Sequence, residues 1–234
     1  MVKLEIIVDT LQDALFAERA GATQLDLKAD FPNGGVTQSA GMIEHVCKTL
    51  GIPVMVMIRP HHRAWIMNED DLEIMYRDIH VARQFGAEHF LLGCLNEAGE
   101  IHRAAYKRFQ DAAGDGFLHS HLVWEKATNP SEALQALISL GVKSVRTTGG
   151  SGLGGKVEDN LAAVRSFVER AQGQIEFFLA GGVHAGNVEK LVLETGITNL
   201  HIGTGAREPA NREGVVTEKK VKQIREALDQ VVVS

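Results

Sequence analysis

Short runs of apolar and β-branched residues recur along the chain, separated by longer stretches with a helical spacing of apolar positions. Eight of these runs predict strands at residues 4–8, 24–27, 54–58, 89–92, 117–122, 144–147, 175–179 and 199–202. A helical pattern follows each run, and no linker or low-complexity segment interrupts the alternation. The pattern therefore predicts one domain over residues 1–234, a closed parallel (β/α)8 barrel of the TIM type. A flavodoxin-like open sheet is the alternative, although it usually needs only five or six such units.

The ends of the predicted helices carry recognisable signals. Asn68 precedes the acidic turn of residues 69–71, and Asn129 precedes Pro130, so each asparagine suits the first position of a helix. Four glycines stand where a helical pattern stops and are expected to end it in a left-handed conformation: Gly21, Gly51, Gly86 and Gly141.

Composition narrows the class of protein. Hydrophobic residues make up 44% of the 234 residues, which is enough for a substantial core, and the net charge is −6 with a pI near 5.9. This charge argues against nucleic acid or an anionic membrane surface as a partner, and no apolar run approaches the ~20 residues of a spanning helix. The chain enters a strand at once without a signal peptide, and Cys47 and Cys94 form no C-x-x-C pair. We therefore expect a cytoplasmic protein.

Polar residues interrupt the predicted strands on the side that faces the barrel axis. In these barrels the functional groups lie at the C-terminal ends of the strands, and alternation decides which side chains point inward. The inward-facing polar residues are Glu5, Asp26, Lys28, Arg59, His119, His121 and His201. Two carboxylates, two cations and three histidines would meet on one axis, where an unpaired charge costs several kcal/mol. We therefore predict a binding site for a small molecule at this end of the barrel.

Glycines after the last two predicted strands suggest where an anion could bind. Gly181 and Gly182 follow the seventh strand, and Gly203 and Gly205 follow the eighth. Their backbone N–H groups could hold a phosphate, as in many barrels, although simple tight-turn geometry explains them equally well. Residues 150–156 match the G-x-x-x-x-G-K part of a phosphate-binding loop. Val157 stands where that motif needs a hydroxyl, so we interpret the segment as a flexible loop.

Several segments together resemble the CutC family, whose members are traditionally labelled copper-homeostasis proteins. The matching segments are residues 4–10, Asp26-Leu27-Lys28 with residues 34–41, residues 57–60, His121 with residues 128–130, residues 147–150, and residues 180–187. They follow the family's order from Glu5 to His201. The resemblance implies a TIM barrel, a role in copper handling by family naming, and a polar core of Glu5, Asp26, Arg59 and His121.

The chain also departs from the family pattern. Where the family has Glu-Leu-Cys, this sequence has Asp26-Leu27-Lys28, and the family's His-Arg-Ala-Phe-Asp segment has become residues 121–125, His-Leu-Val-Trp-Glu. Copper(I) prefers thiolate and thioether donors, and a charged lysine cannot coordinate it. The sequence is therefore identified as a divergent member.

Three functions remain open at this point. The first is a CutC-like barrel that binds a small polar metabolite, with copper implied only by the family name. The second is a lyase, isomerase or epimerase acting on a sugar or sugar phosphate, in which a divalent metal held by Glu5, Asp26, His121 and His201 is one variant. The third is a metal carrier that uses Cys94 with Met55 or Met57 as ligands. A buried, inert Cys94 is favoured over a reactive thiol.

The candidate residues divide by role. We expect Glu5, Asp26 and His121 to be catalytic. The expected substrate-binding residues are Lys28, Arg59, His119, His201, Gly181, Gly182, Gly203 and Gly205. No metal ligand set is assigned, the expected partner is a small-molecule ligand, and a homo-oligomer stays an open alternative.

Overall fold

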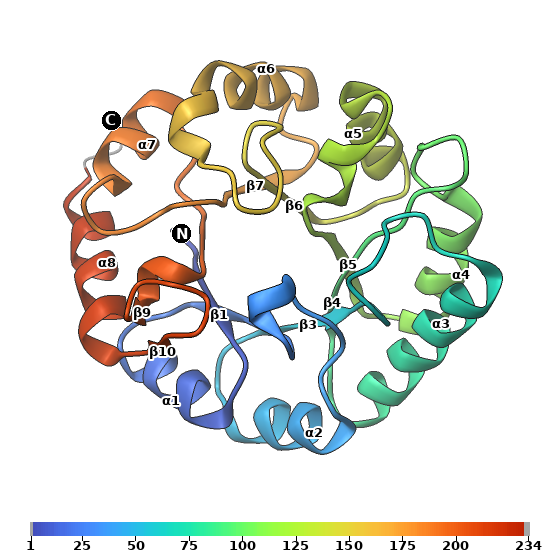
Figure 1. The fold of residues 1–234 in the computed structure, drawn as a ribbon, viewed down its shortest axis with the longest axis horizontal. Helices are drawn as coiled ribbons and strands as arrows, with labels where there is room; N and C mark the ends of the chain where they lie inside the picture. The colour runs from blue at the N-terminus through green and yellow to red at the C-terminus, as the bar shows by residue number, and fades with distance from the viewer. Residues whose placement is uncertain (1, 232–234) are drawn as a thin grey trace.

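In the computed structural model, which describes residues 2–231, eight parallel strands close into a barrel surrounded by eight helices (Figure 1). The strands are β1 (Leu4–Val8), β2 (Gln24–Leu27), β3 (Val54–Ile58), β4 (His89–Leu92), β5 (Phe117–Ser120), β6 (Ser144–Thr147), β7 (Glu176–Leu179) and β8 (Leu200–Ile202). The helices are α1 (Leu11–Arg19), α2 (Ala40–Thr49), α3 (Glu69–Gln84), α4 (Arg103–Ala113), α5 (Pro130–Ser139), α6 (Leu161–Ala171), α7 (Val188–Thr195) and α8 (Glu218–Gln230). The predicted TIM barrel is confirmed.

The fifth strand is shorter than predicted. It ends at Ser120, and a 3-10 helix, η2 (Leu122–Lys126), follows directly. The reason is local, because His121 Nδ1 accepts a hydrogen bond from the N–H of Val123 at 3.2 Å and turns the chain out of the strand. The seventh and eighth strands also begin one residue later than predicted.

Most of the predicted helix ends are present. Asn68 caps α3 in a reciprocal capping box with Asp71, and Asn129 caps α5 through the N–H groups of its first turn. Gly21, Gly86 and Gly141 have positive φ. The prediction was wrong for Gly51, which does not adopt the left-handed conformation. The preceding residue, Leu50, is extended, and the Gly51 N–H donates a hydrogen bond to the Glu18 carboxylate at 2.7 Å.

The core has two separate parts. The outward-facing strand residues, such as Leu4, Ile6 and Val8, pack against the helices in one large cluster. Inside the barrel, Met55, Met57 and Leu91 form a small apolar cluster of their own. The barrel interior therefore has an apolar part at these three side chains of β3 and β4, and polar side chains on several other strands.

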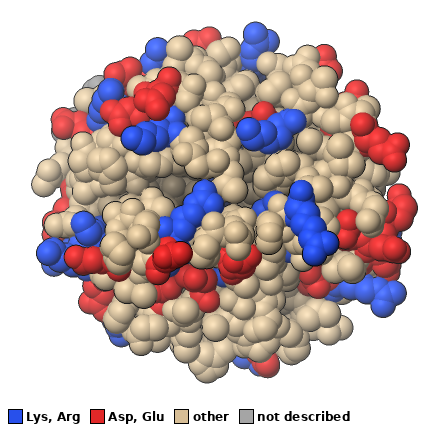
Figure 2. Space-filling view, viewed as in Figure 1, with Lys and Arg blue, Asp and Glu red and all other residues tan. Residues whose placement is uncertain are grey.

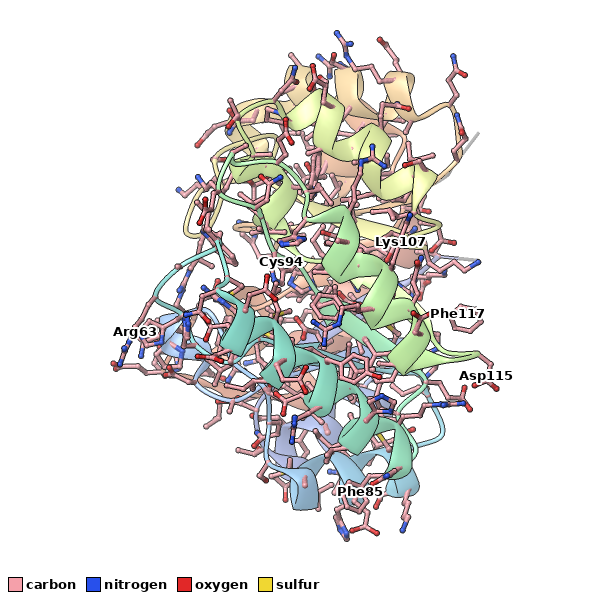
Figure 3. All side chains as sticks on the ribbon, turned by 90° about the vertical axis from the view of Figure 1, so that its right-hand side faces the viewer. Arg63, Phe85, Cys94, Lys107, Asp115 and Phe117 are labelled. Carbon is pink, nitrogen blue, oxygen red and sulfur yellow. The ribbon has the colours of Figure 1, made fainter. Side chains whose placement is uncertain are left out.

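The two ends of the barrel differ. Figure 3 shows Arg63, in the loop after β3, at one end and Asp115 and Phe117 at the opposite end. The end that carries Arg63 is where the strands finish, and we call it the mouth. At the centre of the mouth in Figure 1 lies a short 3-10 helix, η1 (Phe31–Asn33), from the loop after β2.

The loop that carries η1 comes very close to the barrel. Gly34 and Gly35 both have positive φ, and a side chain on Gly35 would collide with that of Lys28. Only glycine combines this conformation with this close approach. The loop therefore lies directly over the inward-facing side chains of β2 and β3.

After β8 the chain forms a short antiparallel pair, β9 (Arg207–Glu208) with β10 (Val215–Val216). Among the helices within residues 2–231, none has both the length and the apolar character needed to cross a bilayer.

A pair of glycine variants tests the packing at the mouth. A Cβ on Gly93, just after β4, would overlap the side chain of Val123 and lie 3.0 Å from Cε1 of His121. Gly93→Ala should therefore destabilise the protein by about 1–3 kcal/mol through overpacking. Gly41→Ala, in α2 with nothing near its Cβ, should stabilise it by about 0.5–1 kcal/mol. Urea unfolding measures both changes, and equal effects would contradict the predicted crowding.

Candidate active site at the barrel mouth

Glu5 lies at the centre of the barrel and is fully buried. Its carboxylate accepts hydrogen bonds from Arg146 on β6, with Nε at 3.0 Å, and from Gln24 Nε2 at 2.5 Å, and it contacts His201 Nδ1. Burial alone would raise the pKa of Glu5, but the charge of Arg146 and the hydrogen bond with His201 outweigh it and lower that pKa well below the usual 4.5. Glu5 is therefore ionised at neutral pH and anchors the side chains around it.

A second ion pair lies at the end of β2. Asp26 and Lys28 are two residues apart, so they share the inward face, and Lys28 Nζ lies 2.6 Å from Asp26 Oδ2. His201 Nε2 lies 3.8 Å from the same oxygen. Asp26 is fully buried, and within the described residues its Oδ1 has no polar partner, while Oδ2 has the Lys28 ammonium beside it. Asp26 thus retains unused capacity to accept a proton or a hydrogen bond.

His121 is a neutral hydrogen-bond donor. Because its Nδ1 accepts from the N–H of Val123, the ring proton resides on Nε2, which has no partner among residues 2–231. Burial, and then the positive charges of Arg59, Lys28 and Arg146, hold the pKa of His121 well below its usual value. Near neutral pH, His121 therefore carries no charge and offers one free N–H.

Arg59, just after β3, forms no ion pair with a carboxylate among residues 2–231. Its guanidinium lies 4.1 Å from the ring centroid of Trp65 and donates to the backbone carbonyls of Gly35 and His62 at 3.3 and 3.1 Å. Burial lowers the pKa of Arg59 to about 10, so it stays charged, and its Nε has no acceptor in the described part of the chain.

These groups line one small space, which we call the inner cavity, with a volume of about 60 Å³. Its polar walls are Asp26, Lys28, Arg59, His121, Arg146 and His201. Four apolar side chains cover it. One is Trp65, and we call the other three, Phe31, Leu122 and Leu153, the apolar partition. Within residues 2–231, six buried side-chain atoms lack a hydrogen-bond partner, and four of them belong to Asp26, Arg59 and His121. Unpaired buried polar atoms are costly, so their convergence on one cavity indicates a ligand site.

A larger space, the outer cleft, lies on the other side of the apolar partition and has a volume of about 290 Å³. Residues 152–156, Gly181, Gly182, Gly203 and Arg212 line it. Figure 2 shows a hollow left of the centre of the mouth face, bordered by Lys or Arg side chains. The backbone N–H groups of Gly181, Gly182 and Gly203 form no hydrogen bond within the described residues. They remain available to an anion.

Some predicted site residues lie elsewhere. Glu5 sits beneath the inner cavity and is not part of its wall. His119 lies deeper still, with Nδ1 2.7 Å from Ser144 Oγ and Nε2 3.1 Å from His89 Nδ1. Gly205 lines a neighbouring groove and not the outer cleft. The structure therefore brings five of the predicted residues together in the wall of the inner cavity: Asp26, Lys28, Arg59, His121 and His201. Glu5, His119 and Gly205 lie outside that wall.

Sequence reasoning missed Arg146 and the loop of residues 152–156. Alternation in Ser144-Val145-Arg146-Thr147 would have turned Arg146 inward, because Val145 faces the helices. The glycine-rich loop was interpreted only as flexible, yet it forms one wall of the outer cleft. Phe31 and Trp65 left no periodic signal, because they lie in loops.

The donors needed for copper do not converge. Within residues 2–231, no three His, Cys, Asp or Glu side chains are arranged to hold a metal ion. Cys94 packs in the outer core beside the start of α4 (Figure 3), and burial raises its pKa to about 12. Met55 and Met57 lie in the separate cluster inside the barrel. The hypothesis of a carrier that combines Cys94 with these methionines is therefore not supported by their positions.

The fold and the polar mouth define a TIM-barrel protein with a small buried site at the C-terminal ends of its strands. The CutC family profile matches residues 2–206, so the chain belongs to the CutC family. It is 31% identical to the family protein CutC of Vibrio parahaemolyticus over 93% of this chain and 88% of that one. It is also 29% identical to the human copper homeostasis protein cutC homolog, over 85% of this chain and 71% of that one.

Solved structures agree with this assignment. The crystal structure of a CutC protein from Streptococcus agalactiae matches with a TM-score of 0.81 and 28% identity, over 87% of this chain and 98% of that one. Phosphoribosylanthranilate isomerase from Thermotoga maritima matches with a TM-score of 0.64 over 98% of this chain and 99% of that one. At 13% identity, the second match shows a shared fold only.

The Glu5 anchor predicts a specific dependence of stability on pH. Because the folded pKa of Glu5 lies below its unfolded value of 4.5, its stabilisation is complete above that pH and is lost as the pH falls below it. Glu5→Gln leaves Arg146 unpaired and should cost about 3–5 kcal/mol at neutral pH. The difference from wild type should shrink below about pH 4.5 in urea unfolding.

Glu176→Gln is the matched control, because Glu176 forms an exposed ion pair with Lys3. It should cost less than about 1 kcal/mol. Wild-type and Glu5→Gln stability curves that run parallel from neutral to acid pH would contradict the anchoring role of Glu5.

Proposed function

We propose that this protein is an acid–base enzyme, a lyase or isomerase, that acts on a small polar metabolite bound at the barrel mouth. The observation that carries the proposal is the convergence of unpartnered atoms of Asp26, Arg59 and His121 on the inner cavity. A buried acceptor, a buried donor and an unpaired cation in one small cavity are what proton transfer at a carbon next to a carbonyl requires.

Asp26 is the proposed base. Its Oδ1 has no partner and can accept a proton, while Oδ2 is paired with Lys28 Nζ at 2.6 Å. His121 is the proposed partner on the carbonyl oxygen. As a neutral ring with a free Nε2–H, it can donate a hydrogen bond to the oxygen as negative charge develops there.

Arg59 and Lys28 are proposed to hold oxyanions of the bound molecule. Both line the inner cavity, and their side chains are buried, where electrostatic stabilisation is stronger than in solution. The Glu5–Arg146 pair beneath them holds His201 in place through its Nδ1. This leaves Nε2 of His201 facing Asp26.

A phosphate group of the metabolite is proposed to bind in the outer cleft. Free N–H groups of Gly181, Gly182 and Gly203 line the cleft together with the cations Lys156 and Arg212. Backbone N–H groups combined with cations are a common way to bind phosphate. The cleft borders the inner cavity, so one molecule of modest size can reach both.

Proton exchange with solvent tests this proposal without knowledge of the natural substrate. In D2O, we expect deuterium to enter the position next to the carbonyl of at least one of pyruvate, 2-oxobutanoate, dihydroxyacetone and dihydroxyacetone phosphate, followed by NMR. Asp26→Asn and His121→Gln should each slow this exchange by at least about 100-fold. Asp115→Asn, an exposed site at the other end of the barrel, is the control.

Two outcomes would contradict the proposal. One is exchange by the Asp26→Asn variant at the wild-type rate. The other is the absence of enzyme-dependent exchange for every compound of the panel.

Copper handling is the second candidate, and the names of the human and mouse relatives favour it. The scattered positions of Cys94, Met55 and Met57 argue against a tight copper(I) site built from these donors. We expect the reduced protein to lose copper(I) to a competing chelator, with Cys94→Ser behaving as wild type. Tight one-to-one binding that Cys94→Ser abolishes would instead favour a carrier.

A further inference from the structure

The charges around the inner cavity do not balance. Three cations, Lys28, Arg59 and Arg146, face two carboxylates, Asp26 and Glu5. Lys28 pairs with Asp26 and Arg146 pairs with Glu5, so the uncompensated charge is that of Arg59. Within residues 2–231, the guanidinium of Arg59 contacts two backbone carbonyls and the face of Trp65.

An uncompensated buried cation is costly. Taking an ion out of water costs several kcal/mol, and neutral carbonyls with a cation–π contact recover only part of this. Arg59 is 2% exposed, and its Nε–H has no acceptor in the described residues. A bound anion would remove both deficits at once. We infer that the ligand of the inner cavity carries a carboxylate that binds to Arg59, and that the ligand is a 2-oxo or 2-hydroxy carboxylic acid.

The size and charge of the cavity select this class. A volume of about 60 Å³ holds on the order of five water-sized groups, which suits a carboxylate with its neighbouring carbon and one oxygen. One positive charge is balanced by a monoanion, and a planar carboxylate matches the geometry of a guanidinium. The 2-oxo or 2-hydroxy oxygen then has the free Nε2–H of His121 as its donor, and Asp26 is left for the proton.

This inference rests on the proposed function for the location of the site, and it adds the substrate class. The rest of the molecule would extend past the apolar partition into the outer cleft, where Lys156 and Arg212 favour a second anionic group. The ligand is therefore acidic at its inner end, whatever its outer end carries.

Trp65 provides a direct readout, because its ring lies against Arg59. Titration with pyruvate or lactate should change its fluorescence in a saturable way. Lactamide, which has the same shape without the charge, should bind at least about ten-fold more weakly. Arg59→Gln should weaken lactate binding about 10- to 100-fold, the range for a lost charged hydrogen bond. Trp65→Phe identifies the part of the signal that comes from Trp65 and not from Trp124.

Two further variants complete the design. Arg59→Lys keeps the charge but loses the fork of donors, so it should bind lactate with intermediate affinity. Arg77→Gln removes a positive charge from the exposed face of α3 and should leave lactate affinity unchanged. Thermal shift with lactate repeats the comparison without relying on fluorescence, and circular dichroism verifies that each variant is folded.

The outcomes separate this inference from the proposed function. Equal affinities for lactate and lactamide, unchanged lactate binding by folded Arg59→Gln, or no binding of either acid would overturn the carboxylate. If deuterium still entered dihydroxyacetone in a reaction that depends on Asp26, the proposed acid–base function would be retained. Lactate binding that depends on Arg59, with exchange unaffected by Asp26→Asn, would keep the carboxylate site and remove the proposed chemistry.

Discussion

The ion pair between Glu5 and Arg146 crosses the barrel interior between strands that are not neighbours, since β7 and β8 lie between β6 and β1 in the ring. Its two charges neutralise each other in the interior, where either one alone would be very unfavourable. The same carboxylate orders Gln24 and His201, so the side chains beneath the mouth have defined positions. With that layer fixed, the unpaired atoms above it can be left free for a ligand without loss of the fold.

The fold was largely predictable because its signals are local and repeated. Strand alternation and helix caps such as Asn68 act within a few residues, so the sequence displays them directly. The errors arose where a contact overrode the local pattern. β5 ends early because the ring of His121 accepts a hydrogen bond from the N–H of Val123. Gly51 does not adopt a left-handed conformation, because a carboxylate from another helix accepts a hydrogen bond from its N–H.

The residues that the strands contribute to the candidate site were predictable, and the loop residues that cover the site were not. Asp26, Lys28, Arg59, His121 and His201 follow from alternation, which also turns Arg146 inward. Alternation cannot tell how deep a residue lies, so it gave Glu5 and His119 the same weight as the residues of the cavity wall. Phe31, Trp65 and Leu153 come from three loops, and only tertiary packing brings them together.

The position of Phe31 links the cover of the mouth to the seam at which the barrel closes. Its ring lies 4.7 Å from the guanidinium of Arg207, which also binds the carbonyl of Ile7 and the carboxylate of Asp9 at the end of β1. Arg207 follows β8, so one residue fastens the first strand, the last strand and the cover. Local unfolding at this seam would release Phe31 together with β9. A rearrangement at the junction of β1 and β8 would therefore also disturb the inner cavity, because Phe31 is part of its lining.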